Sequence, residues 1–578
     1  MKFRVNDDGV FVLKGETSKK LAARVDILAE GRDGAGCNWS RLLRWCDRDG
    51  LEHRWLMPMG LLDGDPAGVR QRLVSEGVFL ERDRSSREDF IEYLQTWPVN
   101  RLVRSVQRTG WCRNNYILPD RVLGEDHDEE IIFQPPQGAQ RLFGVSGTVD
   151  TWRDKIGRLC AGNSRLVFAT SAALTGPLLT PLGAESGGFH FYGLSSTGKS
   201  TALSVAASVC GPQVLVRSWR ATANGLEAIA ALHNDTTLFI DELGQANPNE
   251  AEQLIYMLAN GIGKGRMNER LELVQTATWK ILTLSTGELT LAGHVATIEK
   301  KLRGGAEVRL ANIDADAGAG MGLFEDLHGI EKPDAFADQL KALARKHYGG
   351  PFLAFLQKLI ADTSWKRDVL DAQSQFAEVY VPVDAGGEVK RAGMRFGLIG
   401  AAGELATRYG VFGWDDGEAL WAAGTCFESW LANRGTIGSS DMENALNQVR
   451  GFIEVNGSSR FQNLDAPGDN RPIHNRAGFK RSRGANGEIE YLILRQVFQE
   501  EVCRAFEYRK VSRALNERGL LRREGDGRNM TIKTRLPELG NVRVYCIRGA
   551  ILDDDESTRI RQKDSRWEQV RSVGANLT

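Results

Sequence analysis

The octapeptide Gly-Leu-Ser-Ser-Thr-Gly-Lys-Ser at residues 193–200 restricts the possible folds of this chain more than any other feature. The apolar run FHFY before it is typical of a buried strand, and the segment TALSVAASV after it is typical of a buried helix. A glycine-rich loop between a strand and a helix directs backbone N–H groups and the positive end of the helix toward one point, where phosphates bind. The octapeptide therefore predicts a nucleotide-binding P-loop fold, rather than an ordinary glycine turn.

Each part of this loop has an expected role toward ATP and Mg²⁺. Lys199 is expected to reach the β- and γ-phosphates, and the Ser200 hydroxyl is expected to bind Mg²⁺. The residues expected to contact the nucleotide are Gly193, Ser195, Ser196, Thr197, Gly198, Lys199, Ser200 and Thr201.

The apolar segment TTLFIDE at 236–242 predicts a strand that ends in two carboxylates. Asp241 is expected to hold Mg²⁺ through water, and Glu242, on the other face, is expected to polarise the attacking water. The alternative is a helix that begins with two acidic residues, which is favourable for the helix dipole. The spacing from Lys199 leaves room for one short α/β unit, which favours the catalytic interpretation.

A third strand, ILTLSTGE at 281–288, also ends in polar groups. Ser285 or Thr286 could hydrogen-bond the γ-phosphate or the attacking water, which is the sensor-1 role in AAA+ ATPases, and Ser285 is the first choice. The alternative is that the hydroxyl only stabilises a turn.

The segment 263–280 between these strands is too polar and too long for a simple connection. It predicts a basic hairpin with Asn268-Glu269 at its tip, of the kind that minichromosome-maintenance and superfamily-3 helicases project into a central channel. Cations on such a hairpin would contact nucleic-acid phosphates independently of sequence, whereas the alternative is a solvated surface loop. The predicted nucleic-acid contacts here are Lys264, Arg266 and Arg270.

A ring ATPase needs an arginine from the neighbouring subunit to neutralise the charge that develops on the γ-phosphate. Arg309, in the strand-like segment EVRLANI, is the first candidate for this residue, and Arg303 is the second. Arg391 and Arg395 share one helix face at i, i+4 spacing. One of them could contact the nucleotide as a sensor-2 arginine, or both could form surface ion pairs.

Residues 440–550 carry 20 Lys and Arg against 14 Asp and Glu, unlike the nearly neutral whole. The pattern of helix, helix and two strands in this region predicts a winged-helix module. Arg509 and Arg513 lie opposite the apolar stripe of the second helix and are the candidate DNA contacts. The alternative is that this module packs against the ATPase.

Composition excludes several classes of protein. Lys+Arg 74 against Asp+Glu 75 gives a net charge of -1, which excludes a uniformly basic nucleic-acid coat but not a local basic patch. The eight cysteines are scattered singly, which predicts reduced thiols rather than a zinc site. The uncharged run at 166–184 contains Gly176-Pro177 and Pro181, so a buried helix is expected there rather than a membrane span. With no apolar signal sequence at the N-terminus, a cytoplasmic protein without membrane partners is expected.

Several of these segments together resemble one known family. FHFYGLSSTGKSTAL, SWRATANGLEAIAALHND, LFIDELGQ, YMLANGIGKGR, LTLSTGE and FGLIGAAGELA are similar to the domain of unknown function 927 family of phages and mobile elements, over about residues 1–550. Some members of that family resemble minichromosome-maintenance-type helicases. The resemblance implies an AAA+ core, a hexameric homo-oligomer and replication of mobile DNA. The family commonly has Thr where this chain has Ser200, a chemically equivalent hydroxyl.

The predicted fold class is an α/β P-loop core of AAA+ type, with an N-terminal α+β module, a helical lid and a C-terminal winged-helix domain. The predicted units are the N-terminal module (1–145), a helical linker (146–185), the ATPase core (186–330), the helical lid region (331–438), the winged-helix-like domain (439–550) and a tail (551–578).

The sequence thus predicts an ATP-dependent hexameric DNA helicase or translocase of a phage or mobile genetic element, acting on single strands or forks in DNA replication. A separate primase or initiator would be a further partner, because no primase module is visible. The alternative function is a non-motor ATPase switch that loads or recruits other proteins on DNA.

Overall fold

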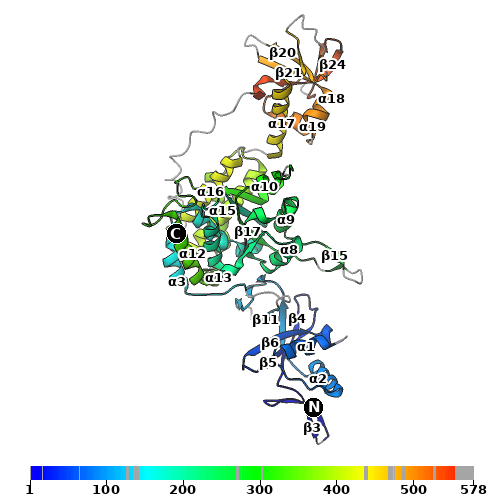
Figure 1. Cartoon of the computed structure of the whole chain (residues 1–578), viewed down its shortest axis with the longest axis vertical. Coiled ribbons are helices and arrows are strands. Elements are labelled where there is room, and N and C mark those ends of the chain that lie inside the picture. The colour runs from blue at the N-terminus through cyan, green and yellow to red at the C-terminus, as the bar shows by residue number, and fades with distance from the viewer. Residues whose placement is uncertain are drawn as a thin grey trace.

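The computed structural model describes residues 2–15, 17–63, 66–124, 129–134, 142–267, 273–274, 276–300, 302, 304–434, 440–465, 473, 475–483, 488–504, 506–524 and 529–552. Figure 1 shows three bodies along the longest axis: N-terminal strands in blue, a central body of helices around a sheet, and C-terminal strands in orange. No helix among the described residues is long and apolar enough to cross a membrane.

The N-terminal body contains two sheets and their covering helices. A three-stranded antiparallel sheet has the order β1-β2-β3, and a five-stranded sheet has the order β11-β7-β4-β5-β6. β5 and β6 form an antiparallel hairpin with Leu43 opposite Trp55, which agrees with the alternation of apolar residues in the two strands. The elements are β1 Phe3–Asn6, β2 Gly9–Lys14, β3 Thr17–Ala22, β4 Asp26–Arg32, β5 Ser40–Cys46, β6 Glu52–Pro58, η1 Met59–Leu62, α1 Ala67–Ser75, α2 Arg84–Thr96, β7 Leu102–Val106 and β11 Glu130–Phe133.

A small sheet inside the predicted first unit packs on the central body instead. It consists of β8 Gly110–Cys112, β9 Asn115–Leu118 and β10 Arg121–Leu123. The Trp111 amide donates to the Asp235 carboxylate at 3.0 Å, and the Tyr116 hydroxyl donates to the Asp235 carbonyl at 2.5 Å. The boundary at residue 145 remains a prediction, but these buried contacts cross it and tie the segment 110–123 to the parallel sheet.

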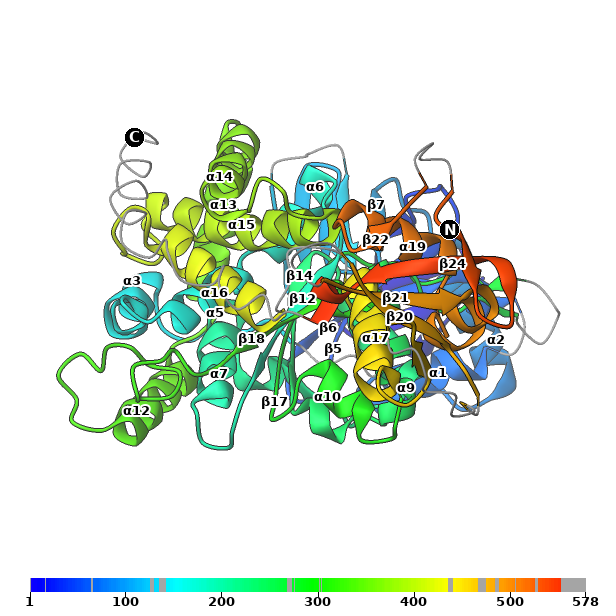
Figure 2. The ribbon, with the colours of Figure 1, turned by 90° about the horizontal axis from the view of Figure 1, so that it is seen from above.

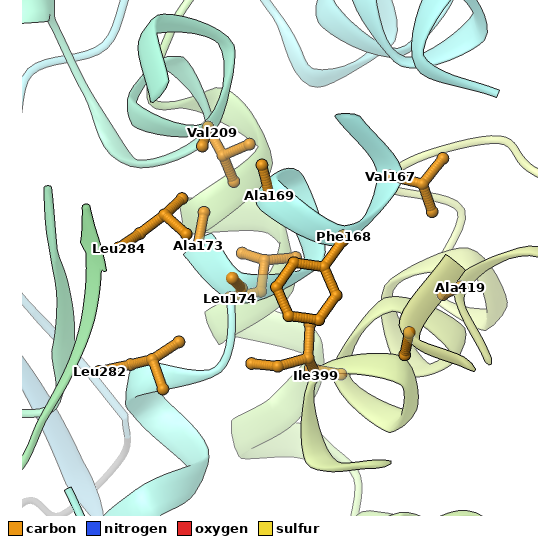
Figure 3. Close-up of a cluster of buried hydrophobic side chains, with 14 of the residues drawn as sticks. Val167, Phe168, Ala169, Ala173, Leu174, Val209, Leu282, Leu284, Ile399 and Ala419 are labelled. Carbon is orange, nitrogen blue, oxygen red and sulfur yellow. The ribbon is translucent and has the colours of Figure 1, made fainter. Parts of the chain in front are cut away.

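The linker region is helical, as predicted for 146–185. Every residue of α5 is buried, because this uncharged helix packs against α7, α15 and α16 rather than against solvent. Figure 3 shows Phe168 of α5 among Leu174, Ile399 and Ala419. The elements are α3 Val149–Trp152, the π-helix η2 Arg153–Gly157, α4 Arg158–Cys160, α5 Ser164–Ala173 and α6 Gly176–Leu182.

The central sheet has five parallel strands in the order β13-β14-β17-β12-β18. Its strands alternate with helices, as the sequence pattern predicts for parallel pairing. The elements are β12 Gly187–Tyr192, α7 Lys199–Cys210, η3 Gln213–Leu215, β13 Val216–Ser218, α8 Ala223–Leu232, β14 Thr236–Asp241, η4 Leu243–Gln245, α9 Pro248–Asn260, β15 Arg266–Met267, β16 Leu273–Val274, β17 Ile281–Gly287, α10 Leu291–Ala296, α11 Gly304–Arg309 and β18 Leu310–Asp314.

The two faces of this sheet bury different sets of side chains. Phe189 and Phe191 of β12 point to the face covered by α5 and α7. Leu238 and Ile240 of β14 point to the face covered by α9 and α10. Figure 2 shows α5 and α7 on one side of the strands and α9 and α10 on the other. Alternate residues of each strand therefore belong to opposite sides of the molecule.

The helical region predicted after the sheet is present between residues 333 and 434 of the described chain. Its elements are α12 Pro333–Lys346, α13 Gly350–Ala361, α14 Trp365–Tyr380, α15 Gly387–Arg408 and α16 Glu418–Arg434. α14, α15 and α16 pack together, and their apolar faces join the cluster that covers α5 and α7.

The C-terminal body has more strands than the sequence predicted. β23 and β24 pair antiparallel where two strands were expected. Three further strands lie between the two main helices, and the resulting sheet has the order β19-β20-β21-β24-β22 with β23 also paired to β24. The pattern of helix, helix and two strands was therefore incomplete, because the alternation in β20 and β21 is weak. The elements are α17 Ser440–Asn456, β19 Phe461–Asn463, β20 Gly478–Arg483, β21 Glu488–Leu494, α18 Arg495–Val497, the π-helix η5 Phe498–Val502, α19 Tyr508–Glu517, β22 Leu521–Arg522, β23 Ile532–Leu536, β24 Gly540–Arg548 and η6 Gly549–Leu552.

Candidate active site

The glycine-rich loop lies between the end of β12 and the start of α7, as the sequence predicts. Gly193, Ser196 and Gly198 have φ angles of 151°, 65° and 98°, which lets the chain curl tightly before the helix. Ser195 and Ser196 are exposed, whereas the Thr197 hydroxyl donates to the Leu194 carbonyl at 3.0 Å. A curled backbone at a helix N-terminus is the geometry that phosphate binding requires.

The side chain of Lys199 lies folded over this loop. Its Nζ donates to the carbonyl oxygens of Gly193 at 2.8 Å and Leu194 at 2.6 Å. Burial lowers the pKa of Lys199, although the nearby carboxylates of Glu288, Glu242 and Asp241 act in the opposite direction. The ammonium thus lies at the loop with acidic groups close by. Ser200, the second residue of α7, is exposed, and Thr201 is buried.

The two predicted acidic residues lie at the same edge of the sheet as the loop. β14 ends at Asp241, and Glu242 follows with a φ of 62°, so the chain turns sharply there. The Thr286 hydroxyl at the end of β17 donates to the Asp241 carboxylate, and the Glu242 amide donates to the Thr286 hydroxyl oxygen at 3.4 Å. β17 lies between β14 and β12. Thr286 therefore stands between the acidic pair and the phosphate loop.

Ser285, the first choice for the sensor-1 role, lies on the other face of β17. It is fully buried, accepts a hydrogen bond from Trp219 Nε1 at 2.8 Å, and lies 3.0 Å from Nδ1 of His190. Burial lowers the pKa of His190 to about 4, so its ring is neutral at pH 7. Successive residues of a strand point to opposite faces of the sheet. The Ser285 side chain therefore lies on the face away from Asp241 and the phosphate loop. Of the two residues predicted for the sensor-1 role, Thr286 thus contacts the acidic pair and Ser285, the first choice, does not.

The oxygen donors at this edge fit Mg²⁺. A serine hydroxyl and an aspartate carboxylate are among the ligands that Mg²⁺ takes together with water and phosphate oxygens. Ser200 is the second residue of α7, beside the loop, and the Asp241 carboxylate is held by Thr286. Among the described residues there is no cluster of three or more His, Cys, Asp or Glu side chains that could hold a metal by itself.

Arg309 lies at the opposite edge of the sheet. It ends α11, immediately before β18 begins, so the expectation of a strand at Glu307–Arg309 was wrong. Its guanidinium lies 4.5 Å from the centre of the Tyr256 ring and donates to the Gly305 carbonyl at 2.9 Å. A parallel strand rises about 3.3 Å per residue, so the two ends of the six-residue β12 are roughly 17 Å apart. Arg309 is therefore too far from the loop of its own chain to contact a nucleotide there. Arg303 lies outside the described residues.

The polar insert contains the predicted hairpin. β15 and β16 pair antiparallel with Met267 opposite Leu273, and Figure 1 shows β15 extending away from the central body. Lys264 is exposed at the base of this hairpin, and Arg266 begins β15. Arg270 lies outside the described residues.

The second main helix of the C-terminal body has the predicted two-sided character. Val511, Ala514 and Leu515 are buried, while Arg509 and Arg513 are exposed. The Arg509 guanidinium lies 5.8 Å from the Tyr508 ring centre. Arg509 and Arg513 are thus free to meet a partner, which leaves their DNA role a prediction.

Residues 3–279 match the family model described as "Domain of unknown function (DUF927)". The chain contains a DUF927 domain. The predicted resemblance to this family is confirmed, but the matched range ends at 279 rather than near 550. The DUF927 domain includes the phosphate loop, the acidic strand and the hairpin, whereas Thr286, Arg309 and the C-terminal body follow it.

The fold is shared with a solved structure described as "SCCmec type IV Cch - active helicase". The TM-score is 0.71 with 18% sequence identity, covering 96% of this chain and 99% of that chain. A second solved structure, "The A form apo structure of NrS-1 C terminal region-CTR", has a TM-score of 0.23 and 10% identity over 52% of this chain and 71% of that chain, which supports no argument. No curated protein matches the chain. The mixed α/β fold around a parallel sheet is therefore that of Cch over nearly the whole chain.

Sequence reasoning missed a segment that touches the phosphate loop from outside the DUF927 domain. The Leu323 amide donates to the Thr197 carbonyl at 2.8 Å, and the Ala315 amide donates to the Tyr192 carbonyl at 2.8 Å. Glu288, whose charge acts on Lys199, was also missed. Its signal was its place directly after β17, since the carboxyl ends of parallel strands meet at one edge. The contacts from Ala315 and Leu323 had no local signal, because they depend on how β18 aligns with β12.

Proposed function

We propose that this protein is an ATP-dependent, ring-forming DNA helicase or translocase of a phage or mobile genetic element, acting in DNA replication. The observation that carries the proposal is the meeting of three groups at one sheet edge: the loop with Lys199, the acidic end of β14, and the Thr286 hydroxyl. A phosphate-binding loop without an acidic pair would bind a nucleotide, whereas this combination can also hydrolyse it.

The strand order supports an AAA+ core. A hydroxyl that senses the γ-phosphate must stand between the loop and the acidic pair, and β17, which carries Thr286, lies between β12 and β14. The likeness to Cch, described as an active helicase, supports the helicase activity and the mobile-element setting.

The residues then have these roles. Lys199 exchanges its carbonyl partners in the loop for the β- and γ-phosphates, and its charge offsets theirs. Ser200 and Asp241 would hold Mg²⁺, which neutralises charge on the phosphate oxygens. Glu242 orients and polarises the attacking water, and Thr286 holds Asp241 and the backbone at Glu242 in place.

Arg309 supports a ring of several copies, which we propose is a hexamer. Its place at the far edge of the sheet keeps it from its own nucleotide but leaves it available to that of a neighbouring copy. There it would neutralise the charge that develops on the γ-phosphate. Arg303 is the second candidate for this role.

DNA contacts are proposed at two places. Lys264, Arg266 and Arg270 on the hairpin would grip the phosphate backbone within the ring. The C-terminal body would act as a winged-helix-like domain, with Arg509 and Arg513 on the exposed face of α19. A primase or initiator would be supplied by another protein.

Electron microscopy of the full chain with ATP and forked DNA tests this proposal. We expect a ring with the hairpin facing the DNA, and unwinding of the fork that needs ATP hydrolysis. ATP-dependent assembly on DNA without strand separation would instead favour a switch that loads other proteins.

A further inference from the structure

A cavity of about 450 Å³ lies at the edge of the parallel sheet opposite the phosphate loop. Its walls come from the starts of β12 and β17, the end of α9, helix α11 and helix α15. The charged side chains in its lining are Glu185, Lys280, Arg309, Arg391 and Arg395. Four cations thus face one carboxylate across a space large enough for a small anion.

These cations outnumber the acidic side chains that line the cavity with them. In the part of the chain that the structure describes, none of the four forms an ion pair with a carboxylate. Arg395 donates to the Val308 carbonyl at 2.6 Å, and Lys280 donates to the Ala184 carbonyl at 2.7 Å. Such contacts fix the cationic groups in place but leave their charge uncompensated.

The backbone makes room for the guanidinium groups. A Cβ on Gly187 would lie 2.5 Å from Cζ of Arg395, so the absence of a side chain at the start of β12 leaves room for that guanidinium. A Cβ on Gly305 would lie 2.8 Å from the Tyr256 hydroxyl and 3.2 Å from Nη1 of Arg309. Both arginines thus pack closely against backbone that carries no side chain, and both line the same cavity.

We propose that this cavity is a phosphate-binding site, in which Lys280, Arg391 and Arg395 act together with Arg309. Guanidinium and ammonium groups form their strongest hydrogen bonds with phosphate and carboxylate oxygens. An excess of positive charge in a partly enclosed space favours a compact, multiply charged anion such as phosphate or diphosphate.

Electrostatics support the assignment. Burial and the nearby charges of Arg309 and Arg391 lower the pKa of Arg395 to about 10, against the opposing effect of Glu185. The guanidinium is still protonated at pH 7, and it lies among like charges that a bound anion would offset.

The phosphate has two possible sources. One is free phosphate or diphosphate. The other is the nucleotide held by a second copy of this chain, and this source rests on the proposed function because it needs neighbouring copies that carry ATP. The roughly 17 Å between the edges of the sheet excludes the nucleotide in the same chain as the source.

Calorimetric titration of diphosphate into Lys199→Ala protein tests the cavity itself, because the Lys199→Ala change weakens diphosphate binding at the phosphate loop. We expect one diphosphate to bind per chain. When Lys280→Ala and Arg391→Ala are added to the Lys199→Ala protein, we expect the affinity for diphosphate to fall at least about tenfold. Arg391 is exposed, so the change at this position leaves the core intact. Lys390→Ala is the matched control, since Lys390 is an exposed cation of the same helix that does not line the cavity.

A second measurement identifies the source. Glu242→Gln protein loaded with ATP is mixed with the Lys199→Ala chain, and ATP-dependent complexes are counted by mass photometry. If the Lys280→Ala/Arg391→Ala variant no longer forms these complexes, the phosphate bound in the cavity is that of the nucleotide held by the second copy. If the cavity binds diphosphate but the double variant assembles as before, the phosphate is a free anion.

The proposal is overturned if the double variant changes neither diphosphate affinity nor assembly relative to Lys390→Ala. Because diphosphate binding needs neither unwinding nor hydrolysis, this outcome is separate from failure of the helicase proposal.

Discussion

The two edges of the parallel sheet both gather groups suited to phosphate, but they do so in different ways. At the carboxyl edge, one continuous segment around Lys199 makes the loop, and Asp241 and Thr286 join it from adjacent strands. At the amino edge, four separate segments each bring one or two charged groups to the cavity: the residues just before β12 and β17, helix α11 and helix α15. The first edge can be recognised in the sequence, whereas the second exists only when the whole body has folded.

The comparison also separates what each edge can do. The carboxyl edge has acidic groups beside its lysine, which suits hydrolysis. The amino edge has an excess of cations and no acidic pair, which suits binding or neutralising charge without providing a base. Four predictions test this division, in order of decreasing expected effect.

Substitutions of the groups at the carboxyl edge of the sheet should have the largest effect on activity. Lys199→Ala should abolish ATP binding, because the charge that offsets the phosphates is removed. Glu242→Gln should still bind ATP but lose turnover by about 100-fold or more, since an amide cannot polarise water as a carboxylate does. Binding by fluorescence titration and turnover by phosphate release separate these results. Near-normal turnover in Glu242→Gln would remove this residue from the mechanism.

The hairpin, which emerges from the amino edge before β17, should control motor activity rather than hydrolysis. The triple variant Lys264→Ala/Arg266→Ala/Arg270→Ala should lose unwinding of a forked duplex while keeping DNA-free ATPase activity. Its affinity for single strands should also fall less steeply with salt, because fewer counterions are released. A triple variant that unwinds like the wild type would contradict the channel assignment. A wild type that never unwinds would favour the switch.

Arg309, at the amino edge of the sheet in one copy, is expected to contact the nucleotide at the carboxyl edge of a neighbouring copy. Arg309→Ala should keep ATP binding but lower turnover by about tenfold or more, because the γ-phosphate charge is no longer neutralised. Mixing Arg309→Ala with Lys199→Ala protein should restore part of the activity at mixed interfaces, measured as phosphate release against mixing ratio. Absence of recovery, together with a defect in Arg303→Ala alone, would transfer the role to Arg303.

The smallest expected difference distinguishes neighbouring hydroxyls on opposite faces of β17. Thr286→Val should lower turnover by about tenfold, because Asp241 and the Glu242 backbone lose their common partner. Ser285→Ala should instead lower the free energy of unfolding by about 1–3 kcal/mol, because Trp219 Nε1 and His190 lose a buried partner. Turnover and urea denaturation of both variants provide the measurement. A larger loss of turnover in Ser285→Ala would restore the original choice.

The sequence predicted the local parts of the candidate site well. The loop at 193–200, the strand ending at Asp241 and the hairpin after α9 depend on neighbouring residues, and each has a clear pattern of apolar, glycine or charged positions. The sequence could not decide between Ser285 and Thr286, because their positions relative to Asp241 depend on which face of β17 meets α7. Similarly, the extra strands of the C-terminal body were missed because β20 gains its place from pairing with β21 and not from a strong alternation of its own.

By itself, then, the sequence determined that this chain folds around a phosphate loop with an acidic strand, because a few adjacent residues encode that geometry directly. Tertiary structure alone decided which hydroxyl meets Asp241, and that Arg309 lies at the far edge beside Lys280, Arg391 and Arg395. The physical reason is that strand register and helix packing set these distances, and both depend on contacts between residues far apart in the chain.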